Sequence, residues 1–296
     1  MPEVTQHLRL TCVVVNWNGV ADTLACLASL RLQDYPALSV VVVDNGSTND
    51  SVAQIRAAHP WVNLHETGRN LGFPTGCNVG TRIAYRDGAD LIWLLNNDTV
   101  APPSTASAIV QAARSHPEAG AIGCVLYYLH NPAQVQAWGG GTVNLQSAFV
   151  RHFMRPTPFD APNSFFTGAS LTLPRQICEK VGIFYEGFFM YCDDSDLCLR
   201  IHRMGYPLVL AEDTAILHRE GGSSLKRSPV IDQYATTSTL RMLKRVAPHP
   251  ALSFTVYLGL RLANRLLHLQ WKNFAAVCRG VAVYIRERER KFSDQL

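Results

Sequence analysis

Apolar and polar residues alternate in blocks over the first 130 residues of the chain. Short apolar runs rich in β-branched side chains predict buried strands at 10–15, 39–43, 62–66, 91–95 and 121–128. Between these runs the pattern favours helices, at 21–32, 49–59, 78–86 and 102–115. Strands that are apolar throughout and separated by helices are typical of a mainly parallel sheet with helices on both faces. We therefore expect an α/β fold.

The pattern is less regular after residue 130. The expected elements are a loop or hairpin at 136–150, one strand with a glycine bend at 165–173, a helix at 194–204, and two short strands at 208–210 and 215–217. The helix opens with acidic residues, which suit the positive end of a helix dipole.

Residues 251–291 predict one or two basic amphipathic helices. Their cations recur at steps of three, four and seven, which places them on one helical stripe: Arg261, Arg265, His268, Lys272, Arg279, Arg286 and Arg290. Two interpretations stay open. The helix lies on an anionic membrane surface, or it packs its apolar face on the rest of the protein and leaves a solvated basic face. Aromatic residues are not interleaved with the stripe, so we do not expect nucleic acid as a partner.

Charge and composition divide the chain in two. The net charge of +4 combines residues 1–240, with 16 basic and 20 acidic residues, and residues 241–296, with 11 basic and 3 acidic residues. We expect a catalytic domain over 1–230 and a basic helical extension over 231–296. With 47% hydrophobic and 17% charged residues, the chain is not of the disordered class. It shows neither a signal-peptide pattern nor a run of about 20 apolar residues, so we expect a cytoplasmic protein.

Candidate chemistry lies where the predicted strands end. In a parallel sheet, ligands bind at the carboxyl ends of the strands, and Asp44 and Asp98 follow two of them. The sequence lacks the glycine-rich fingerprints GxGxxG and GxxxxGK[ST], and also the GxSxG elbow. Asp98 with His218 would suit Mg²⁺ or Mn²⁺, and Asp193 and Asp194 would supply a general base. Taken singly, Asp44 could make an Asx turn, Asp98 could cap a helix and His218 could be a core residue.

Seven segments in order carry a resemblance. They are VVVNWNG (13–19), VVVDNGST (41–48), NLGFPTGCN (70–78), WLLNNDT (93–99), FFTGASLTLPR (165–175), GFFMYCDDSDLCLRIHRMGY (187–206) and HREGGSS (218–224). With these segments the chain resembles the family 2 glycosyltransferases of GT-A fold, especially the bacterial rhamnosyltransferase-like branch.

The resemblance implies a role for each matching position. The nucleotide-sugar site would comprise Asn16, Asn18, Asp44, Asn45, Asn70, Gly72, Asn78, Asn96 and Asn97. Asp98 and His218 would bind Mg²⁺ or Mn²⁺, and the single carboxylate of Asn96-Asn97-Asp98 predicts weaker metal binding than two would. Asp194 matches the general base, and Asp193 takes the place of its acidic partner. Acceptor contacts would come from Gly168, Ala169 and Trp138, and for Trp138 a place in a tight hairpin fits the sequence equally well.

The implied activity is inverting, metal-dependent transfer of a sugar, with rhamnose expected, from a dTDP-, UDP- or GDP-sugar. The acceptor would be a hydroxyl of a glycan or lipid-linked saccharide in bacterial surface polysaccharide synthesis, at the cytoplasmic face of the inner membrane. Two alternatives are a sugar-phosphate nucleotidyltransferase and a catalytically degenerate sugar-binding relative. The first is disfavoured because no glycine- and lysine-rich triphosphate loop follows the first predicted strand.

Overall fold

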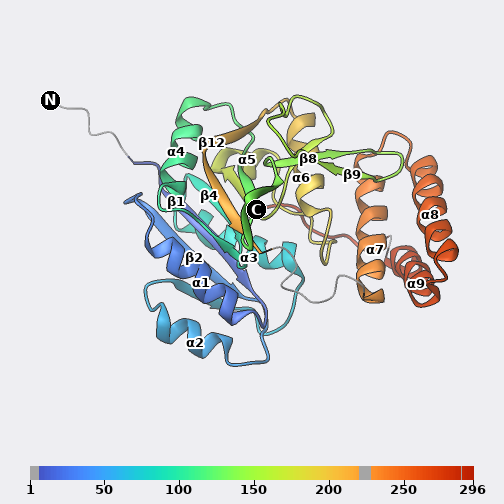
Figure 1. Ribbon diagram of the computed structural model, residues 1–296, viewed down its shortest axis with the longest axis horizontal. Coiled ribbons are helices and arrows are strands. Elements are labelled where there is room, and N and C mark those ends of the chain that lie inside the picture. Colours follow the sequence, from blue (N-terminus) through green and yellow to red (C-terminus); the bar gives the residue numbers. More distant parts are fainter. Residues whose placement is uncertain (1–6, 220–227, 288) are drawn as a thin grey trace.

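The computed structural model describes residues 7–219, 228–287 and 289–296. A nine-stranded sheet forms its centre, in the order β3-β2-β1-β4-β11-β6-β12-β5, with β7 paired to β6 (Figure 1). Its strands are β1 (Leu10–Asn16), β2 (Leu38–Asp44), β3 (Asn63–Glu66), β4 (Leu91–Asn96), β5 (Thr99–Val100), β6 (Ala121–Tyr128), β7 (Asn131–Ala137), β11 (Ser170–Pro174) and β12 (Leu208–His218). β1 to β4 are parallel to one another, and β6 is parallel to β12, while β11 runs antiparallel to β4 and β6.

Helices cover both faces of this sheet. They are α1 (Val20–Arg31), α2 (Ser51–Ala58), α3 (Phe73–Arg86), α4 (Thr105–Ser115), α5 (Arg175–Lys180) and α6 (Asp193–Arg203). Alternate residues of β1 belong to different cores: Cys12 and Val14 pack with α1, α2 and α4, whereas Val13 and Val15 pack with α3, α5 and α6. Both faces of β1 are therefore buried, which explains its continuous apolar run and confirms the α/β expectation.

Three local predictions differ from the structure. The segment 165–173 forms two strands: β10 (Ser164–Phe166) joins a small antiparallel sheet with β8 (Gly140–Val143) and β9 (Val150–His152), and β11 joins the large sheet. The two short strands expected at 208–210 and 215–217 are one strand, β12, with an irregular register between Ala211 and Ala215. Helix α3 begins at Phe73 and not at the expected residue 78. Pro74 is tolerated in a first helical turn, and Gly72, at φ 86°, ends the preceding loop.

A helical layer forms one end of the molecule (Figure 1). It contains α7 (Pro229–Val246), α8 (Pro250–Leu267) and α9 (Trp271–Glu287). The single basic stripe expected over 251–291 is not formed, because the helix breaks between Leu267 and Trp271. In addition, Arg261 and Arg265 point inward and bind the buried carboxylate of Asp232 on α7.

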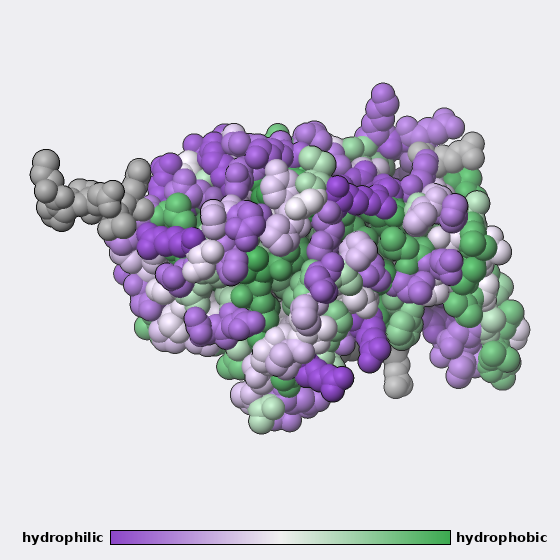
Figure 2. Space-filling model, turned by 90° about the horizontal axis from the view of Figure 1, so that it is seen from above, coloured by the Kyte–Doolittle hydropathy of each residue, from purple (hydrophilic) through white to green (hydrophobic). Residues whose placement is uncertain are grey.

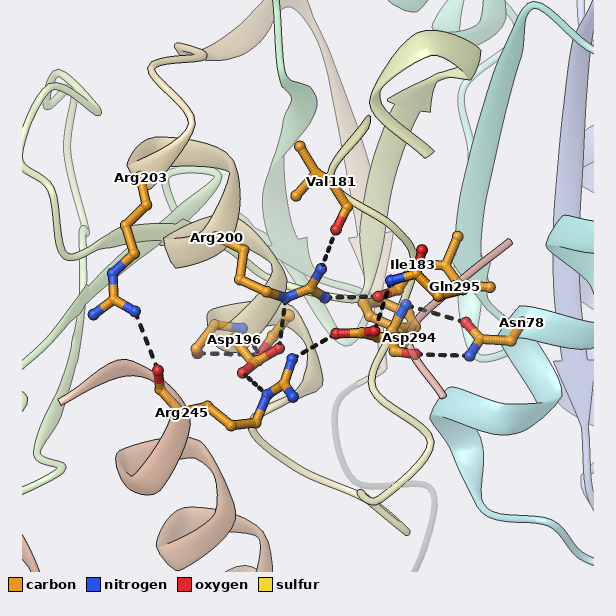
Figure 3. Close-up of polar contacts among 12 residues, drawn as sticks. Asn78, Val181, Ile183, Asp196, Arg200, Arg203, Arg245, Asp294 and Gln295 are labelled. Atoms are coloured by element: carbon orange, nitrogen blue, oxygen red, sulfur yellow. Dashed lines mark hydrogen bonds and ion pairs between the residues drawn. The ribbon is translucent and has the colours of Figure 1, made fainter. Parts of the chain in front are cut away.

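The segment after α9 returns to the half of the molecule that holds the large sheet (Figure 3). The peptide N–H of Ile183 donates to Asp294 O at 2.8 Å, and the Asp294 carboxylate binds Arg245 of α7 at 2.7 Å. Arg245 also binds Asp196 at 2.9 Å, and Asp196 of α6 is fully buried between Arg245 and Arg200. These contacts tie α6, α7 and the segment 289–296 together. No helix of the described residues is long and apolar enough to cross a membrane.

Candidate functional site

A cavity of about 590 Å³ opens beside the end of β4. This volume is within the range of small-molecule sites. Its walls come from both sheets, from α6 and from α7, and its lining includes Asn96, Gln136, Gly168, Ala169, Asp193, Asp194 and His218. Residues expected to act in nucleotide-sugar, metal, base and acceptor roles, from four separate segments, therefore meet around one cavity.

Sheet pairing brings Asp98 and His218 together across 120 residues of chain. β5 pairs antiparallel with the end of β12, so that His218 lies opposite Thr99. His218 Nε2 consequently lies 3.1 Å from Asp98 Oδ1. Burial alone would raise the pKa of Asp98, but the hydrogen bond and charge of His218, together with Arg219, outweigh it and hold that pKa below its ordinary value.

Gln136 of β7 contacts the other ring nitrogen of His218. Its Oε1 lies 2.8 Å from His218 Nδ1, and as an acceptor it favours the tautomer that carries the proton on Nδ1. A cation between Asp98 and His218 would replace the proton of the Nε2–Asp98 hydrogen bond and use the Nε2 lone pair. Sequence reasoning missed Gln136, because it lies in a segment expected only to be a loop or hairpin and belongs to no motif.

The same corner of the cavity suits a divalent cation. Asp98 and His218 supply one carboxylate oxygen and one imidazole nitrogen, and Asn96 Oδ1 is buried without a hydrogen-bond partner among the described residues. Oxygen-rich, incomplete ligand sets are those that Mg²⁺ and Mn²⁺ share with phosphates. The part of the chain that the structure describes holds no cluster of three or more His, Cys, Asp or Glu, so a cation here would rely on ligand oxygens as well.

Asp193 and Asp194 begin α6 after a strained turn. Tyr191 and Cys192 both have positive φ angles, 70° and 67°, which non-glycine residues rarely adopt. The Asp194 carboxylate accepts hydrogen bonds from the peptide N–H of Gly168 at 2.9 Å and from that of Ser195 at 2.6 Å. The turn and these two bonds fix Asp194 at the cavity wall.

The two carboxyls titrate differently from free aspartate. Burial raises the pKa of Asp193 well above its ordinary value, and the adjacent Asp194 charge raises it further. Burial also raises the pKa of Asp194, although its hydrogen bonds to Gly168 and Ser195 and the nearby His152 oppose this. Asp193 is thus the carboxyl that holds a proton more readily, whereas the hydrogen bonds of Asp194 offset part of the cost of burying its charge.

The loops after β1 and β2 form one polar network. Asn16 is fully buried, and its Nδ2 donates to Asp44 Oδ2 at 2.7 Å. The Thr23 hydroxyl donates to Asn16 Oδ1. Asp44 also accepts from the hydroxyl and N–H of Ser47. Asn18, exposed and at φ 56°, accepts from the N–H of Thr48. The structure therefore brings Asn16, Asn18 and Asp44 together. The Asn16 amide is buried, and both its nitrogen and its oxygen are hydrogen-bonded to other residues of the chain.

Asn45 organises the neighbouring loop before α3. Its side chain donates to Gly72 O at 3.0 Å and accepts from the N–H of Leu71, and Asn70 accepts from the N–H of Gly72. A Cβ at Gly72 would lie 2.6 Å from Phe189 O, so only glycine fits this approach.

Three further expected residues lie outside the cavity lining. Asn97 donates to Thr23 at 2.9 Å, next to the β1 loop. Asn78 is buried, and its amide makes two hydrogen bonds to the backbone of Phe184. The N–H of Trp138 donates to Phe153 O at 2.6 Å, within a sheet connection. Most of the HREGGSS motif, from residue 220 onward, lies outside the described residues.

Residues 11–182 match the protein family described as Glycosyl transferase family 2. The chain belongs to this family. Over 237 residues the glycosyltransferase is 28% identical to N-acetylglucosaminyl-diphospho-decaprenol L-rhamnosyltransferase of Mycobacterium tuberculosis, covering 73% of this chain and 77% of that protein. The resemblance found in the motifs is thereby confirmed.

Solved structures agree on the fold of the glycosyltransferase. A mannosyltransferase from Pyrobaculum calidifontis, in complex with GDP-Man and Mn²⁺, superposes with a TM-score of 0.59 at 19% identity, covering 96% of this chain and 89% of that one. S. aureus TarS in complex with UDP-GlcNAc has a TM-score of 0.61 at 15% identity, covering 94% and 81%. These likenesses show a GT-A-type fold.

Proposed function

We propose that this glycosyltransferase moves a sugar, with inversion, from a nucleoside-diphosphate donor to a hydroxyl of a lipid-linked saccharide, and that it uses Mg²⁺ or Mn²⁺. The observation that carries the proposal is the contact of Asp98 with His218, which lines the same cavity as Asp193 and Asp194. The mycobacterial relative is named for rhamnose and a decaprenol-linked acceptor. We therefore propose dTDP-rhamnose as donor and bacterial surface polysaccharide synthesis as the setting.

The residues divide the chemistry between them. Asp98 and His218 would hold the cation, which supplies positive charge against the diphosphate. Asp194 accepts the proton of the acceptor hydroxyl while that oxygen attacks the anomeric carbon and the bond to the diphosphate oxygen breaks. Attack opposite the leaving group inverts the anomeric configuration. Burial makes Asp194 a stronger base than ordinary aspartate, and a proton retained on Asp193 spares Asp194 a second adjacent charge.

A peripheral location on the cytoplasmic face of the inner membrane completes the proposal. A lipid-linked acceptor stays in the bilayer, so the enzyme must approach that surface for transfer. The names of the mycobacterial relative and of the Pyrobaculum neighbour, a rhamnosyltransferase and a mannosyltransferase, favour sugar transfer over nucleotidyl transfer.

The test is release of nucleoside diphosphate from a panel of dTDP-, UDP- and GDP-sugars in the presence of a synthetic lipid-diphosphate saccharide. Asp98→Asn and Asp194→Asn should each lower kcat by roughly 10²–10⁴-fold. Asp213→Asn, an exposed acid on β12, is the matched control and should keep parental turnover. EDTA should abolish turnover, and Mg²⁺ or Mn²⁺ should restore it. Parental turnover of Asp194→Asn would remove the base assignment, and insensitivity to EDTA would remove the metal.

A further inference from the structure

Helix α8 exposes an apolar face along its whole length. Ser253 and Tyr257 are its buried residues. The outward side carries no charge and includes four leucines, with Leu260 60% and Leu267 81% exposed. This outward face comprises Leu252, Thr255, Gly259, Leu260, Ala263, Leu266 and Leu267. At about 100° per residue these positions share one side of the helix.

Helix α9 packs against α8 and also exposes a face, which carries charge. Its outward residues are Trp271, Lys272, Ala275, Cys278, Arg279, Ala282, Ile285 and Arg286. Lys272, Arg279 and Arg286 are seven residues apart and therefore share one edge of the helix, while Trp271, 62% exposed, and Ile285 lie on the other edge. In the turn between the helices, Leu269 is also 71% exposed.

The surface formed by these two outward faces, called here the α8–α9 face, has no acidic residue. Residues 247–286 contain no Asp or Glu. Arg261 and Arg265 are turned away from it and are paired with Asp232. The helical end of the molecule in Figure 2 correspondingly shows apolar residues gathered at the surface. Contiguous exposed apolar patches of this kind mark interaction surfaces.

We propose that the α8–α9 face lies on an anionic bilayer surface. Leucines and Trp271 would enter the boundary between headgroups and acyl chains, while Lys272, Arg279 and Arg286 would contact lipid phosphates. This inference rests on the proposed function only in that a lipid-linked acceptor requires a nearby membrane.

Charge favours a bilayer over a second copy of the chain. A twofold contact between two α8–α9 faces would bring the same three cations from each copy into one interface. Because the face has no acid, those six cations would have no counter-charge there. Anionic headgroups supply that counter-charge.

The helical layer also links this surface to the cavity. Thr239 and Met242 of α7 line the cavity, and α7 packs against both α8 and α9. Two helix diameters, roughly 20 Å, therefore separate the cavity from the proposed lipid surface. A membrane-bound α8–α9 face would hold the cavity close to the surface from which a lipid-linked acceptor extends.

The experiment is co-sedimentation of the full chain with vesicles of phosphatidylcholine, with and without phosphatidylglycerol. We expect binding to the anionic vesicles and a blue shift of Trp271 fluorescence that Trp271→Phe removes. Leu260→Glu/Leu267→Glu should abolish binding. Lys272→Gln/Arg279→Gln/Arg286→Gln should weaken binding roughly 100-fold, since each cation near an anionic surface contributes about fivefold. Leu32→Glu/Met204→Glu, exposed apolar residues of other elements, is the matched control and should bind like the parent.

Equal binding to neutral and anionic vesicles, no binding to either, or the same loss in the control would overturn the inference. A dimer in solution that Leu260→Glu/Leu267→Glu dissociates would also overturn it in favour of a contact between copies. The thermal shift produced by nucleoside diphosphate with Mn²⁺ separates this inference from the proposed function, because every variant should retain it. Vesicle binding without sugar transfer would sink the proposed function and leave the membrane surface standing.

Discussion

Asp232 holds three helices with one carboxylate, and its removal should loosen the helical layer. It is 3% exposed on α7 and accepts hydrogen bonds from Arg261 at 2.7 Å, from Arg265 at 2.8 and 3.0 Å, and from Asn273 of α9 at 2.8 Å. Breaking a buried ion pair costs about 3–5 kcal/mol. The two arginine side chains are 23% and 24% exposed and can turn toward water, which lowers the cost. We expect Asp232→Ala to reduce the free energy of unfolding by about 2–3 kcal/mol.

Urea unfolding followed by circular dichroism measures this difference. Asp213→Ala, an acid on the exposed part of β12, is the control and should change the stability by less than about 0.5 kcal/mol. If Asp232→Ala behaved like this control, the pairing of Arg261 and Arg265 with Asp232 would contribute nothing to the free energy of unfolding. The result would then support the interpretation of a solvated basic stripe.

The pH dependence gives an independent check. Burial would raise the pKa of Asp232, but Arg265, Asn273 and Arg261 hold it below its ordinary value. A depressed folded-state pKa stabilises the protein above the unfolded pKa, and this stabilisation disappears as pH falls through the folded value. The stability difference between the parent and Asp232→Asn should therefore be full at neutral pH and shrink below about pH 4.

Three further predictions concern the cavity. Asp193→Asn should stabilise the protein increasingly as pH rises above the unfolded pKa of about 4, because a carboxyl whose folded pKa is raised costs stability as pH rises toward that folded pKa; an unchanged melting temperature at neutral pH would contradict this. Gln136→Leu should weaken Mn²⁺ binding about 10–100-fold in calorimetry by releasing His218, whereas Gln134→Leu on the exposed part of β7 should not. Gly72→Ala should cost at least about 1–3 kcal/mol in urea unfolding, since φ is 86° and the added methyl meets Phe189 O; parental stability would show that the loop relaxes freely.

The sheet was predictable because its local pattern and its environment agree. The apolar runs of β1, β2 and β4 are buried on both faces, so each run marks its strand without reference to the rest of the chain. Helix α7 gave no such pattern. Its buried side includes Thr236, Thr237 and Ser238, and Thr237 bonds to the Gly280 carbonyl of α9, so polar residues occupy positions where helical periodicity requires apolar ones.

The site divides in the same way. Asp98, His218 and Asp194 stand in recognisable motifs; His218 and Asp194 line one cavity, and Asp98 contacts His218 beside it. Gln136 carries no motif, and its role depends on the pairing of β7 with β6, which no local signal specifies. Helical spacing also could not predict that Arg261 and Arg265 face α7. Spacing shows which residues share one side of a helix, but not whether that side faces solvent or another helix.

The contacts of Asp294 bear on how the protein unfolds. Composition suggests an acidic body and a basic extension that could melt separately. Arg245 of the extension, however, shares Asp196 with Arg200, and the Asp294 carboxylate and carbonyl bind both halves. Neither half can open without exposing the buried Asp196 charge. The two halves should therefore unfold cooperatively, and heating should give one transition in which α6 and the helical layer are lost together.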